Sequence, residues 1–571
     1  MSTEPGPDPT DELTLEPLEP APDGLDEFDA WARKGDDAWH RAEVHQEAGR
    51  RWADQQRPVA ERLLAGIWGA GSGNPVATDL LPLLDDAGLD PVLAARARVA
   101  AALTLVAADP ARAVEFVESA LGVMADDVAF RTRLAVWLAA VEVLARTGRI
   151  PAALKVLDEA GRKAAETPGV PPWAAMAVDA ERLMLMAPGV KDRKQLAPMA
   201  AQIASAAVKL PPTPTAIDIS LKMSSLLVAA GAGREAERIA ERVVAFTRKV
   251  PTAVGVLFQA QMVLADARLL TDGPEAALPE QLKAISILST QGPSPMLGLA
   301  WRGVGMTLRQ LERNEESAEA FRKGAAAYAA LGMTGYEHAL RLDGAESLFH
   351  AEKLDEAREL IEEVRGLLAD VDEAARAPHE MQANRILAYM AAEAGDLDTA
   401  AEHWLEVADL APTAGLSDLE ARLTAAQLYA LDGDHAESDA QFLRAELSAA
   451  EAPDPAGATA EVMRVRAQVL RESGRSEEAA EHARLAANHA RTSGDLAQAV
   501  YLLVVAGDSL HQAGNALASV QVFEEAVETA REAKMTELEA TVHVSFAAVL
   551  KAMGRGPEAE VHEAQARALG R

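Results

Sequence analysis

The chain has 571 residues, no cysteine, 49% apolar and 4% aromatic residues, and a formal net charge of −33. The missing cysteine excludes a disulfide framework, a thiolate zinc site and a cysteine nucleophile. The negative charge repels phosphate backbones and anionic membrane surfaces, so we expect neither a nucleic acid nor a membrane as partner.

Residues 1–25 are predicted to be a disordered acidic tail rich in proline. The first thirty residues hold ten acidic residues, six prolines and no lysine or arginine, which is a composition typical of disorder. A secretory signal needs a basic start followed by an apolar run, and this segment has neither. We therefore expect a cytoplasmic protein.

Residues 26–90 contain four of the eight tryptophans, and most of this stretch is compatible with helix. One interpretation is a helical cap and linker that covers the exposed end of a repeat array. A second is that Phe28 and Trp31, after the acidic tail, form a short linear motif that docks on another protein. A third is that the tail folds back into the chain's own groove.

From residue 91 onward a small residue recurs near the start of a predicted helix, and we call it the marked residue. Its successive spacings are 38 to 43 residues, at Ala113, Ala153, Leu196, Ala236, Ala277, Ser317, Ala357, Ala400, Ser438, Ala479, Ser519 and Ala559. Leu196 is the one bulky member, so its repeat is predicted to be degenerate. Repeats of this length indicate a solenoid built from stacked supersecondary units.

Other positions keep the same frame. Five residues before the mark stands a glycine in seven repeats, namely Gly148, Gly231, Gly395, Gly433, Gly474, Gly514 and Gly554. A glycine there can end a helix in the left-handed conformation. Bulky apolar residues recur four positions after the mark and small or β-branched ones seven after it, which places all three on one helical face. Each repeat is therefore predicted to be a helix, a turn and a second helix.

This pattern resembles the tetratricopeptide repeat. Trp301, Gly305 and Phe321 match its signature around Ser317, and Gly507 and Phe523 match it around Ser519. The repeat length near 40 rather than 34 residues predicts second helices longer by about one turn. Similar long repeats occur in the sensor halves of bacterial transcription regulators and in peptide-sensing receptors.

Motifs for chemistry are missing from the sequence. The glycine-rich segment 66–73 follows a predicted helix and lacks the Gly-Lys-Ser/Thr of a phosphate loop, so we interpret it as a linker. The histidines show no HExxH spacing, and no G-x-S-x-G motif is present. We therefore predict no catalytic residues, no metal and no cofactor.

The resemblance implies that a ligand peptide lies in a concave groove lined by the second, fifth, ninth and twelfth positions of the first helices. In this sequence those positions include Arg302, Arg309, Gln382, Arg385, Tyr389, Arg464, Gln468 and Arg471. Because arginine binds carboxylates through paired hydrogen bonds, an acidic or C-terminal segment is the expected ligand. The alternative is that these arginines pair with neighbouring glutamates along their own helices.

We therefore predict an all-α superhelical solenoid of about twelve antiparallel helix pairs over residues 91–571. Its expected work is non-enzymatic binding of a protein or peptide, as a scaffold or adaptor. A peptide-sensing module that changes curvature on binding is the alternative, and an enzyme built on the helical array is a third. The sequence does not fix the oligomeric state.

Overall fold

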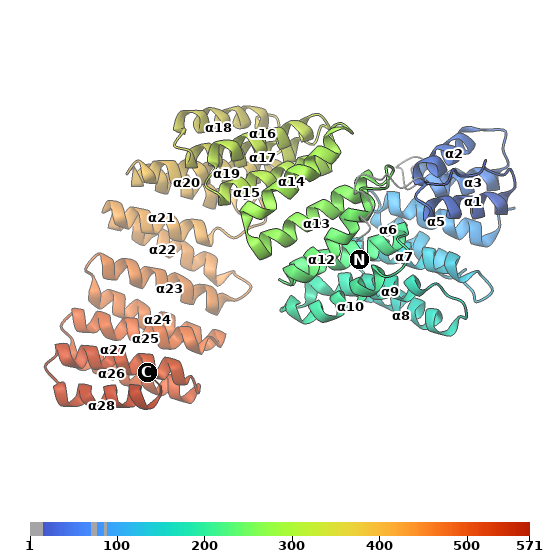
Figure 1. The fold of residues 1–571 in the computed structure, drawn as a ribbon. Helices are drawn as coiled ribbons and strands as arrows, with labels where there is room; N and C mark the ends of the chain where they lie inside the picture. Colours follow the sequence, from blue (N-terminus) through green and yellow to red (C-terminus); the bar gives the residue numbers. More distant parts are fainter. Residues whose placement is uncertain (1–14, 70–76, 85–87, 571) are drawn as a thin grey trace, which may run out of the picture. The chain divides into compact units, whose positions relative to one another are not determined.

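The computed structural model describes residues 15–69, 77–84 and 88–570 (Figure 1), and residues 1–14 of the predicted tail lie outside these ranges. Within them the chain forms α-helices and a few short 3-10 helices, and no β-strand. The predicted all-α fold is confirmed. The chain divides into two compact units, Met1–Leu331 and Gly332–Arg571.

Unit 1 contains the first six predicted helix pairs. They are α5 (Pro91–Leu105) with α6 (Pro110–Leu121), α7 (Phe130–Arg146) with α8 (Ile150–Glu166), α9 (Pro172–Met186) with α10 (Ala197–Ala207), α11 (Pro214–Ala229) with α12 (Gly233–Thr247), α13 (Val254–Asp272) with α14 (Pro274–Ser289), and α15 (Pro295–Gln310) with α16 (Asn314–Ala329). Each helix packs against the next one along the chain. Stacking is what buries the apolar face of each pair.

Unit 2 contains the other six pairs. They are α17 (Thr334–His350) with α18 (Leu354–Leu368), α19 (Glu373–Glu393) with α20 (Leu397–Leu410), α21 (Leu419–Asp432) with α22 (His435–Ala450), α23 (Pro455–Glu472) with α24 (Ser476–Ser493), α25 (Leu496–Gln512) with α26 (Ala516–Glu532), and α27 (Thr536–Ala552) with α28 (Gly556–Ala568). Here too each helix packs against its successor.

The marked residues lie where two helices of a pair approach each other. All twelve are buried, and the most exposed of them, Leu196, is 7% exposed. Eleven lie in the first turns of the second helices, while Leu196 ends a short 3-10 helix, η4 (Arg193–Leu196), directly before α10. The bulky mark therefore coincides with an irregular start of its second helix, in the repeat predicted to be degenerate.

The seven glycines five residues before the mark all have positive φ, between 74° and 94°. The predicted left-handed helix ends are thus confirmed. Two other pairs make the same turn without glycine, because Glu312 and Glu352 have φ of 58° and 60°. A residue with a Cβ pays a steric penalty in this conformation.

The signature glycines allow a close approach between the helices of a pair. A Cβ on Gly305 would lie 2.8 Å from the ring of Phe321, and a Cβ on Gly507 would lie 2.7 Å from the ring of Phe523. The marked serine of each pair donates a hydrogen bond to the carbonyl of the same glycine, at 2.8 Å for Ser317 and 2.7 Å for Ser519. The two pairs therefore share one packing arrangement, which explains why glycine, serine and phenylalanine recur together.

The chain before the repeats forms α1 (Leu25–Asp37), α2 (Arg41–Ala53), α3 (Val59–Gly69) and α4 (Ala77–Leu80). Leu63, Leu64 and Leu80 of these helices share a core with Leu93 of α5. Residues 15–24 have no regular helix, but Leu15 packs against apolar residues of unit 1. This part of the predicted tail therefore makes contacts with the folded unit.

Among the described residues, α13 is the one helix long and apolar enough to cross a membrane. Its Phe258, Ala260 and Leu264 are at most 4% exposed inside unit 1, and α13 packs against α12 and α14. A core position in the helix stack accounts for its apolar composition.

Candidate functional site

A cavity of about 650 Å³ lies on the first helices of unit 1. Leu138 of α7, Asp218 and Leu221 of α11, and Gln259 of α13 line it. Each of these residues lies 15 or 18 residues before the marked residue of its pair, as Arg302 and Gln382 do. The cavity therefore occupies the face that the repeat pattern assigns to the ligand groove.

The turn between α1 and α2 closes one side of this cavity. Trp39 of that turn and Arg41, the first residue of α2, are among its lining residues. The walls combine apolar side chains with the hydroxyl-bearing Thr215 and Thr252 and the amide of Gln259. Ligand pockets are typically apolar cavities of this size with a few polar groups that orient the ligand.

Trp39 anchors the turn by contacts to distant parts of the chain. Its indole N–H donates to the carbonyl of Pro212, just before α11, at 2.8 Å. Its own carbonyl accepts a hydrogen bond from Thr252 Oγ1, just before α13, at 2.8 Å. The ring contacts Phe246 of α12, with centroids 5.8 Å apart, and Trp39 is 8% exposed.

The charges beside the cavity are already paired. Arg41 donates to Asp36, and that hydrogen bond, together with the nearby carboxylates of Asp36 and Asp218, raises the pKa of Arg41 against the effect of burial. Asp218 also pairs with Lys222 at 2.9 Å. The cavity therefore offers a ligand balanced charges, an aromatic wall and neutral hydrogen-bonding groups.

Asp266 lies seven residues beyond Gln259 on α13, which places it on the same helical face. Burial raises the pKa of this carboxyl to about 6. Titratable groups with strongly shifted pKa values cluster at functional sites. Asp266 is not a lining residue of the cavity, and burial is the single cause of its raised pKa.

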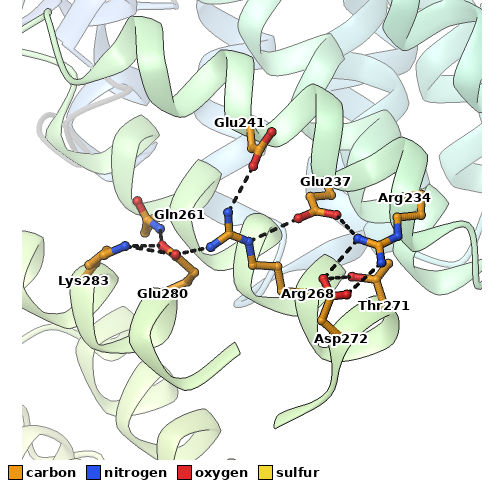
Figure 2. A network of polar contacts seen from close by, with 9 residues as sticks. All are labelled: Arg234, Glu237, Glu241, Gln261, Arg268, Thr271, Asp272, Glu280 and Lys283. Carbon is orange, nitrogen blue, oxygen red and sulfur yellow. Dashed lines mark hydrogen bonds and ion pairs between the residues drawn. The ribbon is translucent and has the colours of Figure 1, made fainter. Parts of the chain in front are cut away.

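A polar network joins α12, α13 and α14 (Figure 2). Arg268 of α13 donates to Glu237 at 3.3 Å and to Glu241 at 3.0 Å, both on α12, and it also donates to Glu280 of α14. Glu280 is 4% exposed and accepts from Lys283 as well. The figure further shows Gln261, Arg234, Thr271 and Asp272 at the two ends of the network.

A smaller cavity of about 330 Å³ adjoins this network. Its wall contains three cations, Arg248, Arg268 and Lys283, together with the carboxylates Glu241 and Glu280. Because Arg268 and Lys283 pair with those carboxylates, the network compensates its own buried charge and holds three helices together.

Two of the sequence-predicted groove residues lie in unit 1. Arg302 is exposed on α15, and Arg309 is partly buried, with its guanidinium 5.2 Å from the ring centroid of Phe321. Arg309 therefore packs on the signature phenylalanine of its own pair.

The other predicted groove residues lie in unit 2. Arg464 makes two hydrogen bonds to Glu461, three residues earlier on α23, and Gln468 donates to Glu472. Gln382 donates to Asp343 of α17. These contacts correspond to the alternative in which the polar groups pair within the array.

Four predicted residues of unit 2 have exposed side chains, namely Arg385, Tyr389, Gln468 and Arg471. Tyr389 is 45% exposed and makes an edge contact with Trp404, with ring centroids 5.8 Å apart. The positive charge of Arg471 acts on Asp508 of α25, whose pKa is raised by burial.

Phe28 and Trp31, the alternative docking motif, lie inside the N-terminal helices. Phe28 is 1% exposed and carries the guanidinium of Arg51 at 4.0 Å from its ring. Trp31 stacks on Phe28 and donates to the carbonyl of Glu19 at 2.7 Å. Binding of a partner through Phe28 would require this packing to open.

Two histidines meet at the C-terminal end of unit 2. His543 Nδ1 and His562 Nδ1 are 2.9 Å apart, and His543 is 1% exposed. Burial lowers the pKa of both rings, and for His543 the neighbouring His562 lowers it further. Within the described ranges, no group of three His, Cys, Asp or Glu side chains is arranged to hold a metal ion.

Sequence reasoning did not find the cavity or the role of Trp39. The repeat spacing identifies groove positions, but the candidates chosen from it were polar or aromatic, so Leu138 and Leu221 were not among them. The helical cap expected over residues 26–90 put Trp39 at the end of the array. Asp218 and Gln259 are polar and stand at second positions of their repeats, so applying the same spacing to every repeat would have found them.

Comparison with known proteins gives structural likenesses at low sequence identity. No protein-family model matches the chain, and no curated protein matches its sequence. The apo form of RapI has 11% identity and a TM-score of 0.38, with 71% of this chain and 98% of that one covered. The apo quorum sensor NprR from B. thuringiensis has 11% identity and a TM-score of 0.34, with 77% and 98% covered.

The APC/C hetero-tetramer Cut9-Hcn1 is similar over 96% of this chain and 94% of that one, with 13% identity and a TM-score of 0.31. Likenesses at this level carry no conclusion about activity or ligand. The chain itself has the tetratricopeptide-like arrangement of helix pairs, with left-handed turns and the Gly–Ser–Phe packing described above.

Proposed function

We propose that this protein is a non-enzymatic scaffold that binds a protein or peptide along the exposed faces of its first helices. The observation that carries the proposal is the cavity of about 650 Å³ on α7, α11 and α13. Its volume suits one or two side chains of a bound peptide, and its mixed walls suit both the side chains and the peptide backbone.

The cavity anchors an apolar side chain in this proposal. Leu138, Leu221 and Val256 supply apolar surface, and Gln259 and Thr215 can hydrogen-bond the peptide backbone. In unit 2, taken by itself, the exposed Arg385 and Arg471 are the proposed binding residues for an acidic or C-terminal segment. Arg464 is the weaker candidate for this role because Glu461 already holds its guanidinium.

A variant that fills the cavity tests the proposal. Gly255 lines the cavity, and a Cβ added there meets no atom within 4 Å. Gly255→Phe therefore places a ring in the cavity without a backbone clash. Gly366→Phe on α18 is the matched control, because a Cβ there also meets nothing within 4 Å.

Peptides selected from a random displayed library on the wild-type protein supply the ligand for this test. We expect binding to Gly255→Phe to be weaker by about tenfold or more, since one buried apolar side chain contributes about 1.5–3 kcal/mol. Binding to Gly366→Phe should be unchanged. Selection of peptides that bind both variants equally well would refute the cavity as the anchor site.

A peptide sensor is the second candidate function, and the closure of the cavity by Trp39 and Arg41 favours it. A ligand in the cavity contacts both Trp39 and the first helices of the array. Binding can therefore shift the equilibrium between conformations in which these two parts are packed together or apart. Small-angle scattering with and without a selected peptide separates the two functions. A changed profile supports a sensor, and an unchanged profile with full occupancy supports a rigid scaffold.

A further inference from the structure

Residues 36–41 comprise the end of α1, the turn after it and the first residue of α2, and they contact three distant parts of unit 1. We call this segment the Trp39 clasp. Asp37 pairs with Arg131 at the start of α7, at 2.5 Å. Trp39 reaches the chain directly before α11 and directly before α13. The clasp thus touches the starting ends of three first helices that lie 94 to 213 residues away in sequence.

The backbone of the clasp has a conformation at Trp39 that tryptophan rarely adopts. Trp39 has a φ of 69°, in the left-handed region where glycine is the favoured residue. The turn also has the hydrogen bond from His40 N to Gly35 O, at 2.8 Å, that closes such helix ends. A bulky residue in this conformation is an outlier, and such outliers persist where the surrounding contacts hold them.

Repeat arrays are built from contacts between neighbouring repeats, and here α7 contacts α9, α9 contacts α11 and α11 contacts α13. The clasp adds a second connection, from outside the array, that joins the start of α7 to the starts of α11 and α13. Arg131 extends it toward α9, because its guanidinium lies 5.8 Å from the ring centroid of Trp173. A connection of this kind removes the small hinge motions by which a helical array changes curvature.

We propose that the Trp39 clasp locks α7, α11 and α13 into one rigid body and that the cavity on these helices exists in its closed form when the clasp is docked. Trp39 and Arg41 are cavity walls, so undocking opens the cavity to solvent. A ligand that contacts Trp39 therefore stabilises the docked clasp, and the docked clasp strengthens binding by the same factor. This coupling to ligand rests on the proposed function, whereas the locking does not.

The clasp is tested in the full chain without ligand. The native sequence has no cysteine, so pairs of spin labels can be introduced without other changes. One pair, Gln46→Cys with Arg238→Cys, spans α2 and α12 and reports docking. The other, Lys155→Cys with Arg238→Cys, spans α8 and α12 and reports the curvature of the array. All three positions are exposed.

Trp39→Gly is the informative variant because glycine suits the backbone of this turn, so its effect comes from the lost side chain. We expect the width of both distance distributions to increase roughly twofold in this variant. Trp39→Phe keeps a ring but loses the N–H donor to Pro212, so it should broaden both distributions less. Free indole should narrow them again by filling the vacated site.

Two results would overturn the proposal. One is an unchanged Lys155–Arg238 distribution in Trp39→Gly, because the clasp would then have no hold on the array. The other is a broadening that free indole does not reverse, because the effect would then come from misfolding. Neither result depends on peptide binding, so the proposed function is tested separately by the Gly255→Phe variant.

Discussion

Gly507 and Gly366 are both helical glycines of unit 2, yet the same substitution to alanine should change stability in opposite directions. A Cβ at residue 507 would lie 2.7 Å from Phe523, while a Cβ at residue 366 meets nothing within 4 Å. Phe523 is fully buried and stacks on Phe546 with ring centroids 5.0 Å apart and planes 9° apart. The ring therefore has no free space into which it can move.

Both substitutions gain about 1 kcal/mol of helix propensity, so their difference isolates the cost of the clash. Overpacking of a buried contact costs about 1–3 kcal/mol. We expect Gly366→Ala to raise the local free energy of opening by about 0.5–1 kcal/mol. The value for Gly507→Ala should lie about 1–3 kcal/mol below that of Gly366→Ala, each compared with wild type.

Native-state hydrogen exchange resolves this difference helix by helix, which suits an array that need not unfold in one step. For each variant we compare the exchange rate of its helix amides with the rate of the same amides in the wild type. This ratio should be about 5- to 150-fold higher for α25 and α26 in Gly507→Ala than for α18 in Gly366→Ala. Equal and stabilising shifts in both variants would refute the claim that close helix approach requires glycine at residue 507.

Three further predictions use the same assay. Glu312→Gly should raise the opening free energy of α15 and α16 by about 0.5–1 kcal/mol, because it removes a left-handed penalty of about 1–2 kcal/mol and adds some chain entropy, whereas Glu319→Gly within α16 should lower it. The α27–α28 pair should lose stability as the pH falls below about 6.5, because the folded His543 and His562 bind fewer protons than the unfolded chain; exchange in α28 that is flat from pH 7.5 to 5.5, after correction for the intrinsic rate, would contradict this. Asp266→Asn should raise the opening free energy of α13 at pH 7.5 by about 1–3 kcal/mol, since burial raises the pKa of Asp266 to about 6 and disfavours its ionised form. An unchanged opening free energy would show that the carboxylate is well solvated.

The helix pairs could be predicted from sequence because the signals for them are local and repeated. Gly507, Ser519 and Phe523 lie within one repeat and make one packing contact, and the same residue types recur in the pair of Gly305. Eleven of the twelve marked residues therefore locate the first turn of their second helices, and the bulky Leu196 is the exception.

Contacts between distant segments have no such signal. The division after Leu331 leaves the spacing from Ser317 to Ala357 at 40 residues, like most others. The docking of Trp39 depends on Pro212 and Thr252, at sequence separations that no repeat pattern encodes. The left-handed conformation of Trp39 is an observation of the structure, and no sequence pattern predicts it.

The groove residues show the same limit. Arg464 occupies a predicted ligand position, yet Glu461 holds it through two hydrogen bonds. A spacing of three residues on one helix favours such a pair, so the pairing of Arg464 with Glu461 could be predicted as an alternative from the sequence. Whether Arg464 pairs with Glu461 or stays available to a ligand depends on side-chain geometry, which the sequence alone does not give.

The most direct test of the account is a hydrogen-exchange footprint of a library-selected peptide on the wild-type protein. Slower exchange in α7, α11, α13 and the Trp39 clasp, with the second helices α8 and α12 unchanged, is the predicted result. Slower exchange mainly in the second helices, or mainly in α1 and α3 around Phe28, would contradict the account.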